Sequence, residues 1–235
     1  MHCLLKTALL ALLIFSISGC GSLVHYKVKE GDTLYSIGWR YGQDAKQIAE
    51  WNKLRAPYVI HQGQILRISA PAGMPGEPLF TPLQATKTSA QGATELAQSR
   101  AALKSPISQR VGPIAWHWPA DGHLISTFSA RKIDRKGINI SGTKGDAVRA
   151  AALGKVVYSG SGLASYGNLL IIKHNENYLS AYAHNDQLLV KEGDSVSKGQ
   201  RVATMGATGS DKVMLHFEVR YKGNPVDPLK HLPKR

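Results

Sequence analysis

The sequence predicts two folded domains: an α/β unit of the order strand-helix-helix-strand, followed by a mainly-β domain, a β-sandwich of antiparallel sheets. Two observations predict this division. Residues 24–70 place two capped helical segments between two short strand patterns. Residues 116–235 contain short runs of β-branched and aromatic residues that glycines separate at close intervals. A length of 235 residues suits one or two domains.

The elements of the first domain follow from its turn and cap residues. Residues 26–28 alternate as a strand does, and residues 65–68 form a returning strand. Thr33 can cap a first helix, which Gly42 ends. Asp44 can cap a second, shorter helix. The predicted order is therefore strand, helix, helix, strand.

The second domain contains four clear strand patterns and a weak internal repeat. Gly145 and Asp146 open a segment that recurs from Gly193 and Asp194, each followed by a second glycine-led strand. This repeat predicts two similar hairpins that face each other across a sandwich. The four strand patterns are residues 156–158, 169–174, 178–183 and 215–220.

Residues 71–115 differ in composition from the sequence on either side. They hold several Pro and Gly, many Ala, Ser, Thr and Gln, and few large apolar side chains. Such a segment cannot bury enough apolar surface to offset the entropy of ordering. We therefore predict a flexible linker between the two domains.

The N-terminal segment has the sequence pattern of an export signal. Residues 1–19 begin with a positive charge and continue as an apolar run from Thr7 to Ile17. This run is shorter than the roughly 20 residues that a spanning helix needs. Small residues before Cys20 resemble a bacterial lipobox; the alternative is an ordinary signal peptide with an incidental cysteine. The resemblance implies an acylated N-terminus at residues 20–23 and, because Gly21 follows, a lipid anchor in the outer membrane facing the periplasm.

Charge and cysteine content limit the possible partners. The formal net charge of +13 suits an anionic polymer or membrane surface. No helix-turn-helix, zinc-finger or RNA-binding pattern accompanies the charge, so we expect no nucleic-acid partner. The two cysteines, Cys3 and Cys20, both precede the folded domains, which excludes a disulfide framework and a Cys-ligated metal site there.

Four sequence features of the first domain follow one another at a specific spacing: residues 31–34, Ile37, residues 52–54 and residues 63–66. In these features the domain resembles the LysM module. The resemblance implies binding to N-acetylglucosamine polymers such as peptidoglycan glycan strands. Backbone groups of two loops would form the shallow glycan groove. The alternative is that polar residues such as Asp32, Thr33 and Asn52 only cap helices and turns. The expected glycan-binding residues are Gly31, Asp32, Thr33, Leu34, Tyr58, Val59 and Ile60.

The second domain resembles the LytM-type metallopeptidases, which cut peptidoglycan cross-bridges. The resemblance rests on residues 136–140, 166–168, 182–184, 199–200, 206–209 and 215–218. In that family, a His-x-Gly-Ile-Asp motif and a His-Leu-His motif supply three zinc ligands. Here Arg135 and Asn139 stand at two of the ligand positions and His216 at the third. His184 matches the remaining family histidine, and Met214 replaces that histidine's partner.

These replacements imply that the second domain binds no zinc, and we expect no other cofactor. A catalytic zinc needs about three protein ligands and an open water position. One imidazole cannot supply them, and the permanent charge of Arg135 would repel the cation. The resemblance therefore implies a peptidase fold without catalytic residues and without enzymatic activity.

A lipobox, a LysM module and a degenerate LytM-type domain together resemble the NlpD-type murein hydrolase activators of Gram-negative bacteria. In that family the degenerate groove binds a periplasmic zinc N-acetylmuramoyl-L-alanine amidase and displaces an inhibitory segment from it. Septal peptidoglycan is then cleaved and daughter cells separate. The groove residues implied here are Arg135, Asn139, His184, Met214 and His216.

Three alternatives remain. The chain could be a structural tether between the outer membrane and the wall, or an unorthodox zinc endopeptidase of peptidoglycan. The internal repeat also resembles lipoyl and biotinyl carrier domains, but Lys144 and Lys198 lack the neighbouring residues that a modified lysine has there. An amidase pull-down separates an activator from a tether, and metal analysis separates an activator from a peptidase.

Overall fold

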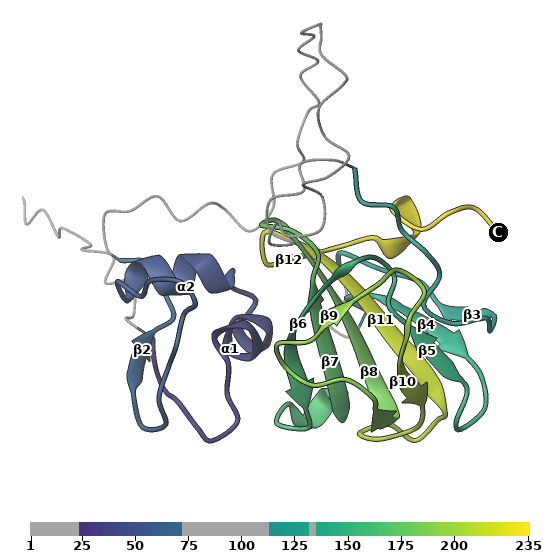
Figure 1. Cartoon of the computed structure of the whole chain (residues 1–235), viewed down its shortest axis with the longest axis horizontal. Coiled ribbons are helices and arrows are strands. Elements are labelled where there is room, and N and C mark those ends of the chain that lie inside the picture. The colour runs from purple at the N-terminus through teal and green to yellow at the C-terminus, as the bar shows by residue number, and fades with distance from the viewer. Residues whose placement is uncertain (1–23, 72–112, 132–134) are drawn as a thin grey trace, which may run out of the picture.

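The computed structural model describes residues 24–71, 113–131 and 135–235, which form two domains lying side by side (Figure 1). The predicted export signal, Cys20 and almost all of the predicted linker lie outside these residues. No helix in the described ranges is long and apolar enough to cross a membrane.

The first domain has the predicted order of strand, helix, helix, strand. Thr33 caps the first helix by accepting a hydrogen bond from the Ser36 amide at 3.0 Å, and Gly42 ends it in the left-handed conformation, with φ at 67°. Asp44 caps the second helix through the Lys46 amide at 2.7 Å. The antiparallel strands pair from His25 to Lys27. The elements are β1 (His25–Lys27), α1 (Leu34–Tyr41), α2 (Ala45–Trp51) and β2 (Ile65–Arg67).

The second domain is mainly β and antiparallel, as predicted. In the part of the chain that the structure describes, its strands join one ten-stranded hydrogen-bonded network. The elements are β3 (Leu124–Ser126), β4 (Ile138–Ser141), β5 (Ala147–Arg149), β6 (Gly154–Gly160), β7 (Asn168–Lys173), β8 (Tyr178–Leu188), β9 (Ser195–Val196), β10 (Arg201–Met205), β11 (Met214–Tyr221) and β12 (Asn224–Val226), with short 3-10 helices at Ala164–Tyr166 and Pro228–Lys230.

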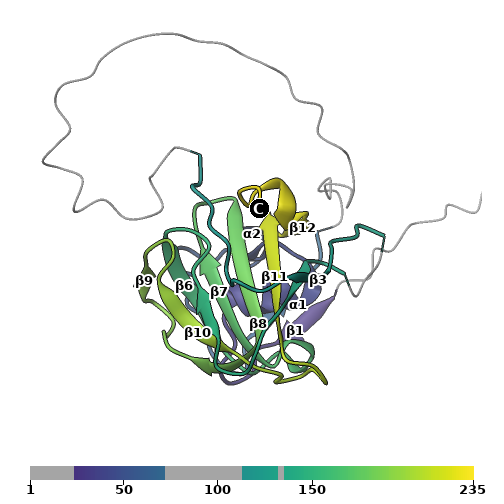
Figure 2. The same cartoon turned by 90° about the vertical axis from the view of Figure 1, so that its right-hand side faces the viewer.

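Two layers arise because this network branches at β8. The first part of β8 pairs with β7 and β11, whereas its end pairs with β10, which also pairs with β5. Figure 2 shows β10 next to β8. The largest apolar core, which includes Val148, Val202, Tyr182 and Phe217, contains side chains from both parts. The predicted sandwich therefore has two layers, but both belong to one hydrogen-bonded network that branches at β8.

The internal repeat does not form the two hairpins that the sequence analysis predicted. Instead, the two copies exchange strands: β5 of the first copy pairs with β10 of the second, and β9 of the second pairs with β6 of the first. Gly145 and Gly193 have φ of 93° and 92°, so both turns require the left-handed conformation. The Ala150 amide of the first copy donates to the Gln200 carbonyl of the second at 2.8 Å, which adds a further hydrogen bond between the copies. Exchange buries both copies in a common core, which two separate hairpins could not provide.

Helix α1 packs against the second domain, over the face of β6, β7 and β8 (Figure 1). An apolar cluster spans this contact and includes Trp39, Val157 and Leu169. Two side chains of the first domain also donate hydrogen bonds to the second: Thr33 Oγ1 to the Val157 carbonyl and Arg40 to the Gly162 carbonyl, both at 3.2 Å. The two domains therefore share a buried interface.

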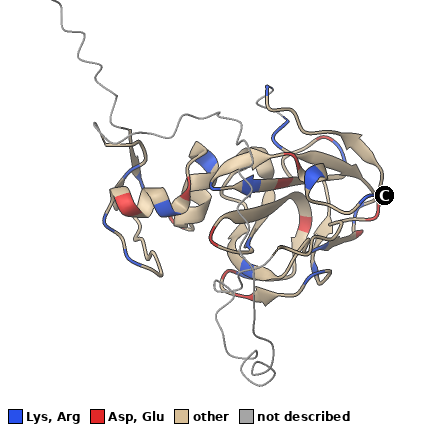
Figure 3. Ribbon diagram, turned by 90° about the horizontal axis from the view of Figure 1, so that it is seen from above, with Lys and Arg blue, Asp and Glu red and all other residues tan. Residues whose placement is uncertain are grey.

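Charged residues are spread over both domains. Figure 3 shows basic and acidic positions interspersed along the ribbon, without a single basic block. This distribution agrees with the sequence, in which the net charge of +13 is not confined to one segment.

Candidate functional site

A groove lies between α1 and strands β4, β8 and β11, and encloses about 780 Å³. Four of the five predicted groove residues line it: Asn139, His184, Met214 and His216. Strand pairing brings them together, because His216 on β11 is opposite Asn139 on β4 and opposite the neighbour of His184 on β8. The first domain supplies the other wall through residues 39–41 of α1.

Arg135, the fifth predicted residue, is not among the side chains that line the groove. Its guanidinium instead donates to the Thr127 carbonyl at 2.9 Å and to the Thr127 hydroxyl at 3.0 Å. These bonds hold the charged group beside β3, where it stays partly exposed. A guanidinium so placed keeps its hydration, which the groove would partly remove.

His216 is bonded to its neighbours through both ring nitrogens. Nδ1 lies 2.6 Å from Oδ1 of Asn139, and Nε2 lies 3.2 Å from Oε1 of Glu218. These contacts orient the ring within the groove wall. They also occupy the two nitrogen atoms through which an imidazole binds a metal ion.

Glu218 and Arg220 form a buried ion pair behind His216, and the sequence analysis assigned neither residue a role. Glu218 Oε2 lies 3.1 Å from Nη2 of Arg220, and the Tyr166 hydroxyl donates to Glu218 Oε1 at 2.8 Å. Burial alone would raise the pKa of Glu218, but Arg220, His216 and Tyr166 together lower it. A sequence signal for this pair was available. Glu218 and Arg220 stand at alternate positions of a predicted strand, and opposite charges buried together must be paired.

His184 is held in a strained backbone conformation at the floor of the groove. Its φ is 65°, which is uncommon for a residue other than glycine. The ring donates from Nδ1 to the Thr208 carbonyl at 2.9 Å and lies 6.1 Å from the His216 ring, centroid to centroid. Burial, together with nearby His216, lowers the pKa of His184. This side chain therefore offers a neutral imidazole to whatever enters the groove.

The donor set does not fit the zinc ion of the peptidases whose motif the sequence resembles. Of the three matched ligand positions, His216 has both nitrogens bonded, Asn139 offers a neutral amide and Arg135 turns away. Across residues 24–71, 113–131 and 135–235, no group of three or more potential metal-binding side chains is present. A catalytic zinc requires about three such ligands.

The predicted glycan residues line a second cleft, which encloses about 920 Å³. Gly31 is the exception, since it forms the preceding turn with φ at 75°. The carboxylate of Asp32 accepts from the Tyr26 hydroxyl at 2.6 Å and from the Lys29 amide at 2.9 Å, so this side chain holds the loop in place. The cleft-lining residues from the prediction are Asp32, Thr33, Leu34, Tyr58, Val59 and Ile60.

Asn52 stabilises the fold of the first domain, which was the alternative to a role in glycan binding. Its Nδ2 donates to the Ile48 carbonyl at 2.8 Å and to the Arg67 carbonyl at 2.7 Å, while Oδ1 accepts from the Arg67 amide at 2.8 Å. These three bonds fix α2 to β2. Both amide protons of the side chain are therefore engaged within the domain.

Comparison with known proteins matches both domains. Residues 26–69 match the model of the LysM domain, and residues 134–228 match that of peptidase family M23. The chain is 38% identical to murein hydrolase activator NlpD of Escherichia coli strain K12, with 89% of this chain and 68% of that relative aligned. It is 44% identical to the lipoprotein NlpD/LppB homolog of Pseudomonas aeruginosa, with 89% and 77% aligned.

Among solved structures, the chain is similar to a zinc containing peptidase from Vibrio cholerae. The TM-score is 0.47 and the sequence identity is 34%, with 51% of this chain and 41% of that chain covered.

Proposed function

Because this chain belongs to the NlpD family of murein hydrolase activators, we propose that it activates a periplasmic peptidoglycan amidase and catalyses no hydrolysis itself. One observation carries the proposal: the groove of a peptidase fold remains open, while the side chains at its metal positions bond to one another or turn away. Such a groove retains a surface for binding and lacks the ligands for zinc chemistry.

The groove suits a peptide segment of a partner protein. Met214 offers a flexible apolar contact, and His184 and Asn139 offer polar groups at fixed positions. A groove of this kind accepts a helix or an extended segment. To activate the amidase, the chain needs only to bind its open form more tightly than its closed form.

The remaining parts of the chain would bring the groove to its site of action. In this proposal, the LysM module binds peptidoglycan glycan strands and acylated Cys20 anchors the chain in the outer membrane, facing the periplasm. These two attachments would raise the local concentration of the groove near the wall. Amidase activity confined in this way at the septum would allow daughter cells to separate.

Dye release from labelled peptidoglycan tests the proposal. Each purified periplasmic zinc amidase is assayed with and without the full chain, and the chain is also assayed alone. We expect no release by the chain alone and at least tenfold stimulation of one amidase. Chelator-sensitive release by the chain alone would establish an endopeptidase instead. Absence of stimulation with every amidase would leave the chain as a tether between membrane and wall.

A further inference from the structure

We propose that the glycan site is composite: the second domain supplies the opposite wall of the cleft and hydrogen-bonds the same N-acetylhexosamine chain. This inference rests on the proposed glycan-binding role of the first domain. No motif of the second domain pointed to it, because the resemblance placed that domain's function in the other groove.

Two walls of different origin face each other across the cleft. The first domain contributes the loops at residues 32–35 and 56–60, with Val59 59% exposed. The second contributes residues 155–157 of β6, residues 173–176 at the turn between β7 and β8, and a loop before β9. Together they enclose about 920 Å³, within the size range of sites that take small ligands.

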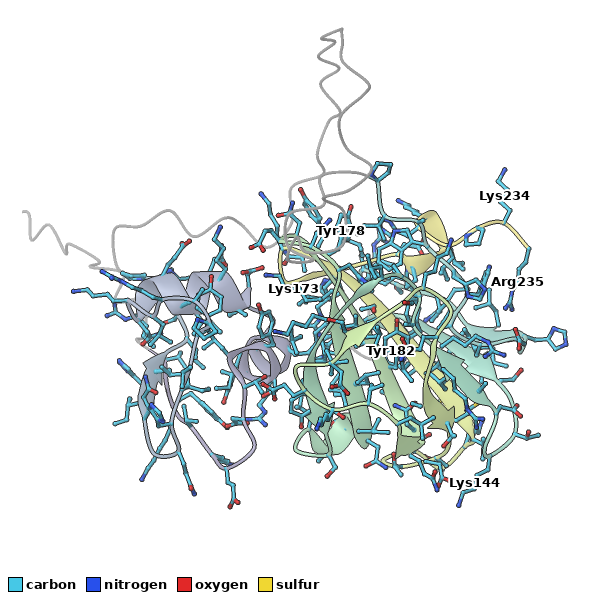
Figure 4. The ribbon with its side chains drawn as sticks, in the orientation of Figure 1. Lys144, Lys173, Tyr178, Tyr182, Lys234 and Arg235 are labelled. Carbon is cyan, nitrogen blue, oxygen red and sulfur yellow. The ribbon has the colours of Figure 1, made fainter. Side chains whose placement is uncertain are left out.

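The wall from the second domain carries charged side chains of both signs. Lys173 Nζ lies 2.9 Å from Oε1 of Glu176 and 6.0 Å from the ring centroid of Tyr35 across the cleft. Figure 4 shows Lys173 at the edge of the second domain that faces the first. Lys155 and Glu192 line the cleft beside them, and both side chains are exposed. The wall thus presents two ammonium donors and two carboxylate acceptors.

This chemistry fits a hexosamine chain. Sugar hydroxyls donate and accept hydrogen bonds, and bonds to charged groups are stronger than bonds between neutral groups. The acetamido group adds one donor and one acceptor. Tyr35 and Tyr58, from the first domain, add large apolar faces against which a sugar ring can pack. A site with both walls therefore engages both faces of the chain.

The two walls are held at a fixed separation. At the base of the cleft, Thr33 Oγ1 donates to the Val157 carbonyl at 3.2 Å, which joins one wall directly to the other. Trp39 and Val157 are both buried in the shared apolar cluster behind it. Binding therefore requires little ordering of the cleft, which favours affinity.

The test is calorimetric titration of the full chain in detergent with the β-1,4-linked tetramer of N-acetylglucosamine. Lys155→Ala and Glu192→Ala should each weaken binding about tenfold, as expected for loss of a hydrogen bond to a charged group. Both side chains are exposed, so the fold should survive, and circular dichroism checks this. Lys198→Ala is the matched control, because Lys198 is also exposed but lines neither cleft, and should bind as wild type.

Val59→Asp separates this inference from the role on which it rests. If Val59→Asp weakens binding while Lys155→Ala and Glu192→Ala bind as wild type, the site is confined to the first domain and the composite site is overturned. If the wild-type chain does not bind the tetramer, the glycan-binding role itself fails, and the composite site fails with it.

Discussion

The guanidinium of Arg220 stacks on the indole ring of Trp39, with Cζ 3.6 Å from the ring centroid, and donates to the Trp39 carbonyl at 3.0 Å. The two residues are 181 positions apart and belong to different domains. Arg220 is 1% exposed and Trp39 3%. Because Arg220 also pairs with Glu218 behind the groove, the domain interface and the groove wall share one buried cation.

Replacing Trp39 with Ala should uncouple the domains. The substitution removes a buried ring and its cation–π contact, which we expect to cost about 3 kcal/mol. Scanning calorimetry should then show one domain unfolding earlier, as a separate transition. Trp39→Phe keeps an aromatic ring, so its stability should lie between that of the wild type and that of Trp39→Ala. If the calorimetric scan of Trp39→Ala were the same as that of the wild type, the interface would contribute nothing to stability.

Restoring two side chains should restore a metal site. Arg135→His combined with Asn139→Asp recreates, with His216, the three ligands of the peptidase motif. Elemental analysis should find close to one zinc per chain in the double variant and no stoichiometric zinc in the wild type. Each single variant serves as a control with too few ligands. Stoichiometric zinc in the wild type would contradict the proposed absence of catalysis.

A charge placed in the groove should abolish amidase stimulation. Met214→Glu adds a carboxylate to a surface that a partner would cover, and an unpaired buried charge costs several kcal/mol. Stimulation should fall at least tenfold, whereas Met214→Leu should retain it. Arg135 was predicted to lie in the groove but does not line it, so Arg135→Glu should leave amidase stimulation unchanged. Loss of stimulation in this variant would show that Arg135 contacts the amidase.

Stability should fall with acid because of His174. Burial lowers its pKa to about 4, while Nδ1 donates to the Leu153 carbonyl at 2.8 Å. Between pH 6.5 and 4 the unfolded chain binds the proton and the folded chain does not, so stability declines as pH falls. At pH 5 this amounts to about 2 kcal/mol relative to pH 7.

The control for this pH dependence is His174→Gln, which cannot titrate. Urea unfolding at both pH values should show a smaller loss in the variant, by about 2 kcal/mol. Equal losses in variant and wild type would assign the pH dependence to other groups.

Cys20→Ala should release the mature chain from the outer membrane. A lipid anchor depends on the thiol, and the LysM module alone would hold the chain to the wall reversibly. Fractionation should therefore find the variant in the periplasm, without incorporated fatty acid. Recovery of labelled lipid on Cys20→Ala would rule out this lipobox.

Local sequence signals predicted the first domain well. Thr33, Gly42 and Asp44 occupy the caps that were expected of them, because capping depends on bonds within a few residues. The exchange of strands between the repeat copies was not predictable in this way, since either pairing satisfies the same local pattern.

The parts of the site that the sequence did not reveal depend on contacts between distant residues. Trp39 could be recognised as helical, but its neighbour Arg220 belongs to another domain. Arg135 occupies the motif position that predicted a place in the groove, yet hydrogen bonds to Thr127 draw the longer side chain away. Spacing assigns a position along the chain, whereas the direction of a flexible side chain depends on its available partners.

Helix α1 borders both clefts. Its N-terminal residues Leu34 and Tyr35 line the cleft that holds the predicted glycan residues, and its C-terminal residues Arg40 and Tyr41 line the groove. One helix of eight residues therefore connects the two clefts. If the two ligands favour different positions of α1, thermodynamic reciprocity follows: a glycan strand that strengthens amidase binding by some factor must itself be held more tightly, by that same factor, once the amidase is bound.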